Sequence, residues 1–209
     1  MKNVHLINHA LVSHKLSILR SELTKPNEFR MLINELTCFL LMETTRNLTL
    51  KESVIQTPLC KTKVLVLNEK IMLCPILRAG LGMLDSALNL IPNASVGFLG
   101  FKRDEISLKP DFYFHNFPND AKNRTCIVID PMLATGGTAI NACDFLKKEG
   151  IKKIIYLSII AAPEGLEAFS SAHSDIEFFV ASIDEKLNSQ GYILPGLGDA
   201  GDRIFNTMS

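Results

Sequence analysis

Apolar residues recur at helical spacing along the first quarter of the chain. A first stripe consists of Leu16, Leu19 and Leu23, and a second consists of Phe29, Leu32, Leu36, Phe39 and Leu40. Pro26-Asn27 separates the two stripes, and such a pair is typical of a break between helices. The pattern therefore predicts two core-packing helices between residues 14 and 46.

The pattern changes to short apolar runs from residue 64 onward. Residues 64–67 and 71–74 are two such runs, and the polar Asn68-Glu69-Lys70 between them predicts a β-hairpin. Beyond them, apolar runs alternate with segments of helical periodicity. We expect strands at 96–101, 125–129, 154–162 and 176–182, and helices at 83–91, 139–149 and 163–173.

This alternation defines the fold class and the place where a ligand would bind. Strands that are apolar on both faces and are joined through helices are typical of an α/β protein with a mostly parallel twisted sheet flanked by helices. Ligands of such sheets bind beyond the carboxyl ends of the strands. The loops after Cys74, Phe101, Ile129 and Ala162 are therefore the expected places for chemistry.

Composition narrows the class of protein. The 209 residues suffice for a single domain, 1–209, with a sizeable core. Lys plus Arg and Asp plus Glu number 22 each, and this zero net charge argues against a nucleic acid partner held by bulk positive charge. We find no run of 18 apolar residues and no signal-peptide pattern, so no membrane association is expected.

The cysteines indicate a reducing compartment, and the histidines do not indicate a zinc site. Five cysteines are widely spaced and form no C-x-x-C pair, which favours free thiols over a disulfide framework. The five histidines form no compact ligand cluster. The expected location is the cytoplasm.

The strongest chemical motif follows the strand expected at 125–129. It reads Asp130-Pro131-Met132-Leu133-Ala134-Thr135-Gly136-Gly137-Thr138. The backbone N–H groups of such a loop and the following helix N-terminus can bind a phosphate, and its hydroxyls and glycines assist. The Asp130 carboxylate suits the vicinal hydroxyls of a ribose. A plain helix cap is the alternative, but a cap does not require this whole set of residues, and no Walker A motif is present.

Two other strand-end loops carry candidate arginines. Arg78 lies in Pro75-Ile76-Leu77-Arg78-Ala79-Gly80-Leu81-Gly82, where its planar fork would bind a diphosphate. Lys102-Arg103 is a basic pair that would reach the same group. The alternatives are a surface arginine in a glycine turn at Arg78 and a solvated charge run at Arg103.

A glycine-rich string near the carboxyl terminus formally matches G-x-G-x-x-G at residues 196–201. A dinucleotide site would need a long helix afterwards and an acidic residue about 20 positions on, whereas the sequence ends at residue 209. We interpret the string as a base pocket rich in backbone groups, in which peptide N–H and C=O groups near Ile193 and from Gly198 to Ala200 match the acceptors and the donor of a nucleobase. A glycine-rich tail turn is the alternative.

These segments resemble the motifs of the uracil phosphoribosyltransferases. The resemblance is carried by the Asp130-Pro131 form of the phosphate loop, by P-I-L-R-A-G-L-G around Arg78, and by Y-I-L-P-G-L-G-D-A-G-D-R at 192–203. It implies the type I phosphoribosyltransferase fold, with an N-terminal helical segment and a C-terminal base-binding hood. It also implies transfer of ribose 5-phosphate from PRPP (5-phosphoribosyl 1-diphosphate) onto uracil, which gives UMP and diphosphate in pyrimidine salvage.

The resemblance further implies roles for single residues. The catalytic residues would be Arg78, Arg103, Asp130 and Asp199. These four would bind PRPP together with Pro131, Met132, Leu133, Ala134, Thr135, Gly136, Gly137 and Thr138, and uracil would be bound by Tyr192, Ile193, Gly198, Asp199 and Ala200. Mg²⁺ held mainly by PRPP and water is the implied cofactor. A flap at 104–117, a homodimer or homotetramer and, as in some relatives, GTP as an effector are implied as well.

Three positions depart from the family pattern. Ala10 stands where proline is frequent, Met42 where tyrosine is common, and Lys186 where glycine is frequent. Lys186 lies close enough in sequence to the base loop to affect its shape. Three rival hypotheses remain at this point: a phosphoribosyltransferase for orotate or a purine, an RNA-binding regulator on the same fold, and a degenerate structural paralogue. The Asp130-Pro131 pair, the zero net charge and the intact motif residues argue against them in turn.

Overall fold

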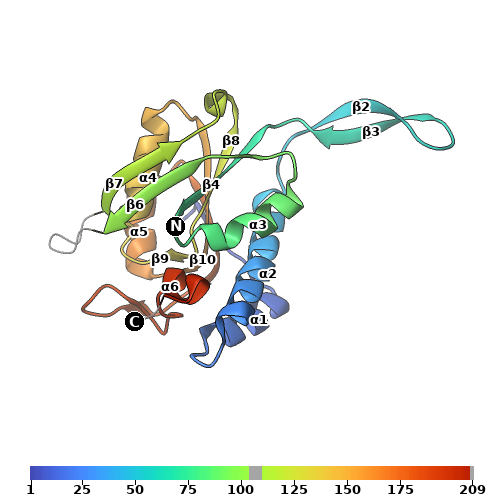
Figure 1. Ribbon diagram of the computed structural model, residues 1–209. Coiled ribbons are helices and arrows are strands. Elements are labelled where there is room, and N and C mark those ends of the chain that lie inside the picture. The colour runs from blue at the N-terminus through green and yellow to red at the C-terminus, as the bar shows by residue number, and fades with distance from the viewer. Residues whose placement is uncertain (104–109, 208–209) are drawn as a thin grey trace.

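A mostly parallel sheet forms the centre of the molecule (Figure 1). The computed structural model describes residues 1–103 and 110–207. The strand order is β1 (Val4–Leu6), β11 (Glu177–Ile183), β10 (Lys153–Ala161), β8 (Thr125–Ile129), β4 (Ile71–Leu77), β6 (Phe98–Arg103) and β7 (Pro110–Asn116). Short strands β5 (Ser95–Val96) and β9 (Met132–Leu133) pair with β4 and β10. The β6–β7 pair is antiparallel and the other pairs of this sheet are parallel, which confirms the predicted fold class.

Helices cover both faces of this sheet and create two cores. One face packs against α1 (Ala10–Arg20), α2 (Pro26–Thr44) and α3 (Leu81–Leu90), and the other against α4 (Gly137–Lys148) and α5 (Pro163–Ala172). Side chains of a strand alternate between faces, so Ile127 and Ile129 of β8 enter the first core and Cys126 and Val128 the second. This double burial is why the strands read as uninterrupted apolar runs.

The two predicted N-terminal helices are confirmed, with one residue misplaced. Pro26 is the first residue of α2, a position where its missing N–H has no intrahelical partner to lose. Leu23, which we had assigned to the first apolar stripe, lies in the connection between α1 and α2 and is 82% exposed. The helical spacing continued past the true end of α1 at Arg20, so periodicity alone placed that end too late.

The predicted hairpin between residues 64–67 and 71–74 is wrong. β3 (Lys61–Leu67) pairs instead with β2 (Leu50–Gln56), while β4 enters the central sheet beside β8. Both strands of the β2–β3 hairpin are largely exposed, and the hairpin extends away from the body of the molecule (Figure 1). Because β2 has no apolar face buried within the chain, its sequence shows no strand alternation to detect.

The topology creates a crevice at the carboxyl ends of β4 and β8. From β4 the chain runs through α3 to β6 on one side, whereas from β8 it runs through α4 to β10 on the other. Neighbouring strands whose connections leave in opposite directions open a binding crevice between them. The C-terminal segment adds β12 (Lys186–Leu187), β13 (Ile193–Leu194) and α6 (Ala200–Phe205), and a short 3₁₀ helix, η1 (Ala121–Asn123), precedes β8. Across the described residues, helices are too short or too polar to span a bilayer.

Candidate active site

The loop that follows β8 lines a pocket of about 150 Å³ at the crevice. Its walls are formed by Asp130, residues 132–139, Tyr156 of β10 and Gly191 of the C-terminal segment. The pocket therefore contains nearly the whole predicted phosphate-binding loop. Pro131 is the exception. It is buried, and its carbonyl oxygen accepts hydrogen bonds from the backbone N–H groups of Ile159 and Ile160.

The N-terminus of α4 faces this loop without a side-chain cap. Gly136 occupies the N-cap position with φ +84°, in the left-handed region that favours glycine, and no side-chain hydrogen bond caps the helix there. The first N–H groups of a helix have no intrahelical partner, and the aligned peptide dipoles place partial positive charge there. Backbone donors are thus available for an anion in the pocket.

Gly165 of α5 packs against the backbone of the phosphate loop. A Cβ atom at Gly165 would lie 2.0 Å from the carbonyl oxygen of Ala134 and 3.3 Å from the nitrogen of Gly136. The atoms it would meet belong to the backbone, so they cannot move aside as a side chain can. The absence of a side chain at Gly165 therefore lets the loop approach α5 closely.

Asp130 provides the carboxylate of the pocket. Burial raises the pKa of its carboxyl from 3.8 to about 7, although the Tyr156 hydroxyl and the Met132 N–H both donate to the carboxyl and favour the charged form. The Tyr156 Oη–Asp130 Oδ2 distance is 3.4 Å. Ser158 Oγ donates to the Asp130 backbone carbonyl at 2.7 Å. Asp130 is therefore positioned from β10 at both its side chain and its backbone.

Arg78 follows β4 directly and lies at the opposite edge of the crevice. A cis peptide bond joins it to Leu77. A Cβ atom at Gly80 would lie 2.5 Å from the Ile129 carbonyl oxygen, so the Arg78 loop packs tightly against the end of β8. The Arg78 side chain is 63% exposed, and its Nη2 lies 3.7 Å from Asp202 Oδ1 of α6. These contacts bring three of the predicted segments together around one crevice.

The predicted uracil residues lie on the C-terminal segment next to α6. Ile193 and Ala200 are buried, whereas Tyr192, Gly198 and Asp199 are exposed. Asp199 is the N-cap of α6, where its Oδ1 accepts from the Asp202 N–H at 2.9 Å. None of these five residues lines the phosphate pocket. A Cβ atom at Gly201 of α6 would lie 3.9 Å from the Ala79 Cβ, so this segment adjoins the Arg78 loop.

Arg103 and the predicted flap lie at the edge of a segment, residues 104–109, that is outside the described part of the chain. Arg103 ends β6, and its side chain is not among those described. Residues 104–109 of the predicted flap lie outside the described residues, whereas 110–116 form β7.

Sequence reasoning missed Tyr156 and two residues beneath the base loop, Arg20 and Asp184. Tyr156 was counted only as part of an apolar strand, yet a buried tyrosine hydroxyl needs a hydrogen-bond partner. That requirement was the available signal. Arg20 and Asp184 form an ion pair across 164 positions of sequence, and no local pattern indicates such a pair.

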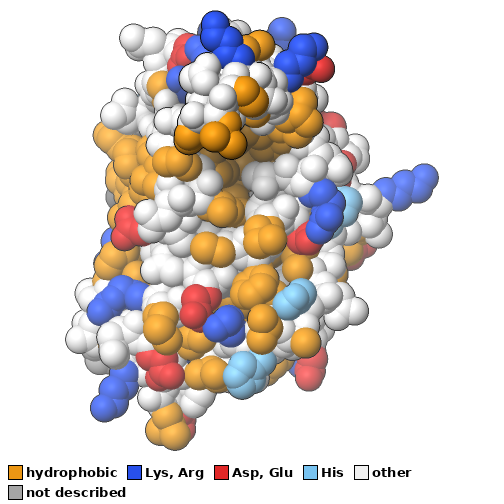
Figure 2. Space-filling view, turned by 90° about the vertical axis from the view of Figure 1, so that its right-hand side faces the viewer, with side chains coloured by type: hydrophobic (Ala, Val, Ile, Leu, Met, Phe, Trp, Pro, Cys, Tyr) orange, Lys and Arg blue, Asp and Glu red, His pale blue; other side chains and the backbone are white. Residues whose placement is uncertain are grey.

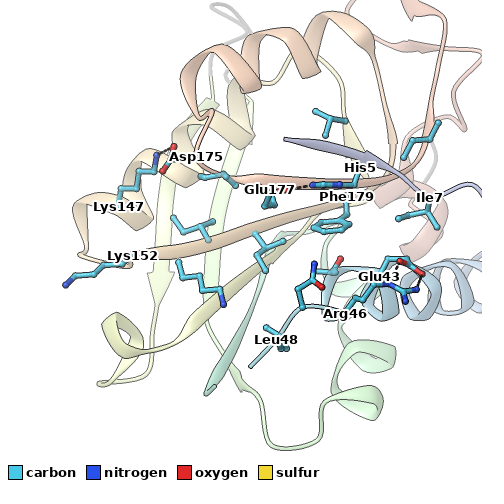
Figure 3. Close-up of a pocket in the computed structure, with 18 residues that line it drawn as sticks. His5, Ile7, Glu43, Arg46, Leu48, Lys147, Lys152, Asp175, Glu177 and Phe179 are labelled. Atoms are coloured by element: carbon cyan, nitrogen blue, oxygen red, sulfur yellow. Dashed lines mark hydrogen bonds and ion pairs between the residues drawn. The ribbon is translucent and has the colours of Figure 1, made fainter. Parts of the chain in front are cut away.

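A larger cavity, about 880 Å³, lies at the amino ends of β10 and β11 (Figure 3). Most of its cations have acidic partners: Lys147 pairs with Asp175 at 2.8 Å, Arg46 with Glu43 at 2.6 Å, and Lys153 with Glu69 at 2.6 Å. Lys152 also lines it. Ligands of parallel sheets bind at the opposite ends of the strands, so the crevice beyond β4 and β8 is the better candidate site.

A family model matches nearly the whole chain. The model for uracil phosphoribosyltransferase matches residues 6–207 of the chain. The chain belongs to the uracil phosphoribosyltransferase family. Its enzyme class is therefore that of the pentosyltransferases.

Relatives in the uracil phosphoribosyltransferase family match the chain over its whole length. A Campylobacter jejuni protein named uracil phosphoribosyltransferase is 64% identical over 208 residues, with 100% of both chains covered. A protein of the same name from Clostridium beijerinckii is 51% identical and covers 99% of this chain and 100% of its own. All four predicted segments lie within these matches.

Solved structures confirm the phosphoribosyltransferase fold. The AQ2163 protein from Aquifex aeolicus superposes with a TM-score of 0.90 and 39% identity, covering 97% of each chain. An adenine phosphoribosyltransferase from Trypanosoma brucei superposes with a TM-score of 0.59 over 91% of this chain and 87% of its own. At 13% identity the second likeness shows the fold alone.

The three departures from the family pattern lie outside the phosphate pocket. Ala10 is the exposed first residue of α1, and Met42 of α2 is 62% exposed. Lys186 pairs with Leu194 in the short β12–β13 ribbon, which places it beside the base loop as its sequence position indicated.

Within residues 1–103 and 110–207, no cluster of three His, Cys, Asp or Glu side chains is arranged to hold a metal ion.

Proposed function

We propose that this chain transfers the 5-phosphoribosyl group of PRPP to N1 of uracil, giving UMP and diphosphate in pyrimidine salvage. The observation that supports this most directly is the pocket formed by Asp130 and residues 132–139, which offers peptide N–H groups and one carboxylate at the carboxyl end of β8. The family membership supplies the pyrimidine as the acceptor.

Within this proposal, the loop binds the sugar phosphate of PRPP. The 5-phosphate accepts hydrogen bonds from the amides at the N-terminus of α4 and from the hydroxyls of Thr135 and Thr138. Asp130 accepts hydrogen bonds from the vicinal ribose hydroxyls. This arrangement fixes the ribose and leaves its C1 directed toward the centre of the crevice.

The leaving diphosphate is stabilised from the β4 side. Negative charge builds on it as the C1–O bond breaks, and Arg78 is placed to neutralise that charge, with Arg103 as a second candidate. Mg²⁺ fits this donor set because it keeps several waters, takes substrate oxygens and needs few carboxylates, of which the exposed Asp199 is the candidate. When bound, the ion would neutralise diphosphate charge.

Uracil is bound by peptide groups of the C-terminal segment. N–H and C=O groups near Tyr192, Ile193 and residues 198–200 match the O2 and O4 acceptors and the N3 donor of the base. N1 attacks C1 opposite the diphosphate, the N1–C1 bond forms as the C1–O bond breaks, and the N1 proton leaves to water or a carboxylate. No residue is assigned as a general base.

The test is an assay of the purified protein with PRPP, Mg²⁺ and each nucleobase in turn. We expect UMP and diphosphate with uracil. Cytosine has an amino donor where uracil has the O4 acceptor, and a peptide N–H left unpaired costs about 1–3 kcal/mol, so uracil should be preferred by about tenfold or more. Equal turnover of cytosine would refute the peptide-group pocket, and turnover of orotate or a purine alone would refute the proposed substrate.

The ionisation of Asp130 should be visible in PRPP use. Its pKa is raised to about 7, and the carboxylate accepts the ribose hydroxyls best when ionised. We therefore expect kcat/KM for PRPP to rise with pH through an acid limb centred near pH 7, and Asp130→Asn to flatten that limb. A limb that persists unchanged in Asp130→Asn belongs to another group, such as the substrate phosphate.

The same pKa fixes the sign of the stability effect in the ligand-free protein. A carboxyl whose folded pKa is raised from 3.8 to about 7 retains its proton longer in the folded state than in the unfolded chain. Its contribution to the free energy of unfolding is therefore greatest at low pH and falls as the pH rises to about 7. Chemical denaturation across this range checks the sign.

We also propose that the enzyme is a homodimer or homotetramer, with the β2–β3 hairpin in the interface. An isolated two-stranded hairpin is marginally stable in water, and this one carries exposed Val54, Leu59 and Leu65. Apolar side chains also gather on the face that lies on the hairpin side of the molecule (Figure 2).

We further propose a cytoplasmic location, which the free cysteines support, and GTP as an effector, which the family resemblance supports.

Replacing an apolar hairpin residue should weaken this association. We expect Val54→Lys to shift the protein toward monomer in sedimentation velocity, because Val54 is 65% exposed in the single chain and would be covered in the assembly. Lys51→Ala is the control, because the Lys51 side chain lies on the opposite face of the same hairpin. A wild-type protein that sediments as a monomer contradicts the assembly.

A further inference from the structure

A buried ion pair lies beneath the C-terminal base loop. Arg20 is the last residue of α1, and Asp184 directly follows β11. The Asp184 side chain is 1% exposed and that of Arg20 is 21% exposed. The guanidinium binds the carboxylate through both nitrogens, Nη1 to Oδ2 at 2.7 Å and Nη2 to Oδ1 at 2.5 Å. Such a fork fixes the relative orientation of the two groups.

Both members of the pair also hold one residue of the loop. The Gly196 N–H donates to Asp184 Oδ2 at 2.9 Å, and the Gly196 carbonyl accepts from Arg20 Nη1 at 2.6 Å. Gly196 has φ +65°, and a Cβ atom there would lie 2.2 Å from the Ile193 carbonyl oxygen. The ion pair therefore fixes a tight turn at which the loop folds back on Ile193.

A second arginine holds the next residue of the loop. Arg203 of α6 donates to the Leu197 carbonyl at 2.7 Å. It also donates to the Leu19 and Ser21 carbonyls, at 2.9 and 2.6 Å. The loop is thus anchored on both sides to the carboxyl end of α1 and the residue that follows it. The N-terminal helices, far away in sequence, determine where this turn lies.

Stability alone does not explain this arrangement. A buried ion pair contributes little net stability, because its attraction is offset by the desolvation of both charges, but it does define geometry. The geometry it defines here is that of Gly196, which lies between Ile193 and residues 198–200. Those are the peptide groups to which the proposed function assigns the base.

We propose that Arg20 and Asp184 are positioning residues that orient the peptide groups of the base loop toward the pyrimidine. This inference rests on the proposed function and adds to it the source of the base specificity. Neither residue touches uracil. They act through Gly196, so their loss affects uracil binding far more than PRPP binding, most of which the loop after β8 provides.

The test compares two matched substitutions in steady-state kinetics with PRPP and uracil. Arg20→Lys keeps the charge but removes the planar fork that bonds two carboxylate oxygens and a carbonyl together. We expect KM for uracil to rise about tenfold, the effect of losing about 1.4 kcal/mol, while KM for PRPP stays within about twofold.

Arg124→Lys is the control for the loss of a fork as such. Arg124 binds Asp120 through two nitrogens at 2.7 and 3.0 Å and donates to the Ile71 carbonyl at 3.2 Å. Its arrangement therefore copies that of Arg20 at the amino ends of β4 and β8. We expect neither KM to change in this variant.

Ser182→Ala decides the case if Arg20→Lys fails to fold. Ser182 Oγ donates to Asp184 Oδ1 at 3.1 Å and accepts from Arg20 Nη2 at 3.2 Å, so its loss loosens the pair without leaving a charge alone. KM for uracil should rise about twofold to threefold, with KM for PRPP unchanged.

Wild-type turnover is measured first. If wild type makes no UMP, the proposed function fails and this inference fails with it. If wild type is active and the folded variants raise both KM values equally, or neither, only the positioning role is refuted.

Discussion

Arg78→Ala should lower kcat/KM by about 30-fold to 10³-fold, a loss of about 2–4 kcal/mol of transition-state stabilisation. Arg78 follows β4 at the crevice, on the side where the proposal places the leaving diphosphate. Charge develops on that group only as the C1–O bond breaks, so the arginine acts mainly on the transition state. Steady-state kinetics with PRPP and uracil measure the effect.

The same substitution should leave the fold nearly unchanged. The Arg78 side chain is 63% exposed and its ion pair with Asp202 is long, at 3.7 Å. Exposed pairs of this kind contribute little to stability. Arg46→Ala is the control, because Arg46 is also exposed and paired but lies away from the crevice. Near-normal kcat/KM in Arg78→Ala would remove Arg78 from the mechanism.

Gly165→Ala should impair both PRPP binding and stability, although alanine normally favours a helix. The added Cβ would lie 2.0 Å from the Ala134 carbonyl oxygen, so the phosphate loop must move. Overpacking of this kind costs about 1–3 kcal/mol of stability. Because the loop amides bind the 5-phosphate in our proposal, we expect KM for PRPP to rise by about tenfold or more.

A control within the same helix separates loop displacement from helix propensity. Ser171 lies in α5 and is exposed, so Ser171→Ala changes helix propensity without adding an atom near the loop. We expect wild-type kinetics from it. Wild-type KM for PRPP in Gly165→Ala, measured on folded protein, would contradict the role given to the loop.

The sheet and its phosphate loop were predictable because their sequence pattern is local. A parallel strand buried on both faces must be mostly apolar, as β8 and β10 are. The loop from Asp130 to Thr138 was predictable because anion binding by backbone needs glycine and small hydroxyl residues next to a strand end. These constraints act on neighbouring residues and are therefore visible in a single sequence.

The features that were missed depend on residues far apart in the chain. The β2–β3 hairpin buries no apolar face within its own chain, so β2 lacks the alternation that identifies a strand. The Arg20–Asp184 pair exists only because α1 packs beside the end of β11. Tyr156 has a polar role only because Asp130 directly follows the neighbouring strand β8, and its hydroxyl was the only local indication.

A crystal structure of the protein with UMP tests the central claim most directly. We predict the phosphate on the amides at the N-terminus of α4, the ribose hydroxyls on Asp130, and the uracil ring against the peptide groups near Ile193 and residues 198–200. UMP bound instead in the cavity at the amino ends of β10 and β11, with the crevice beyond β4 and β8 empty, would contradict the account.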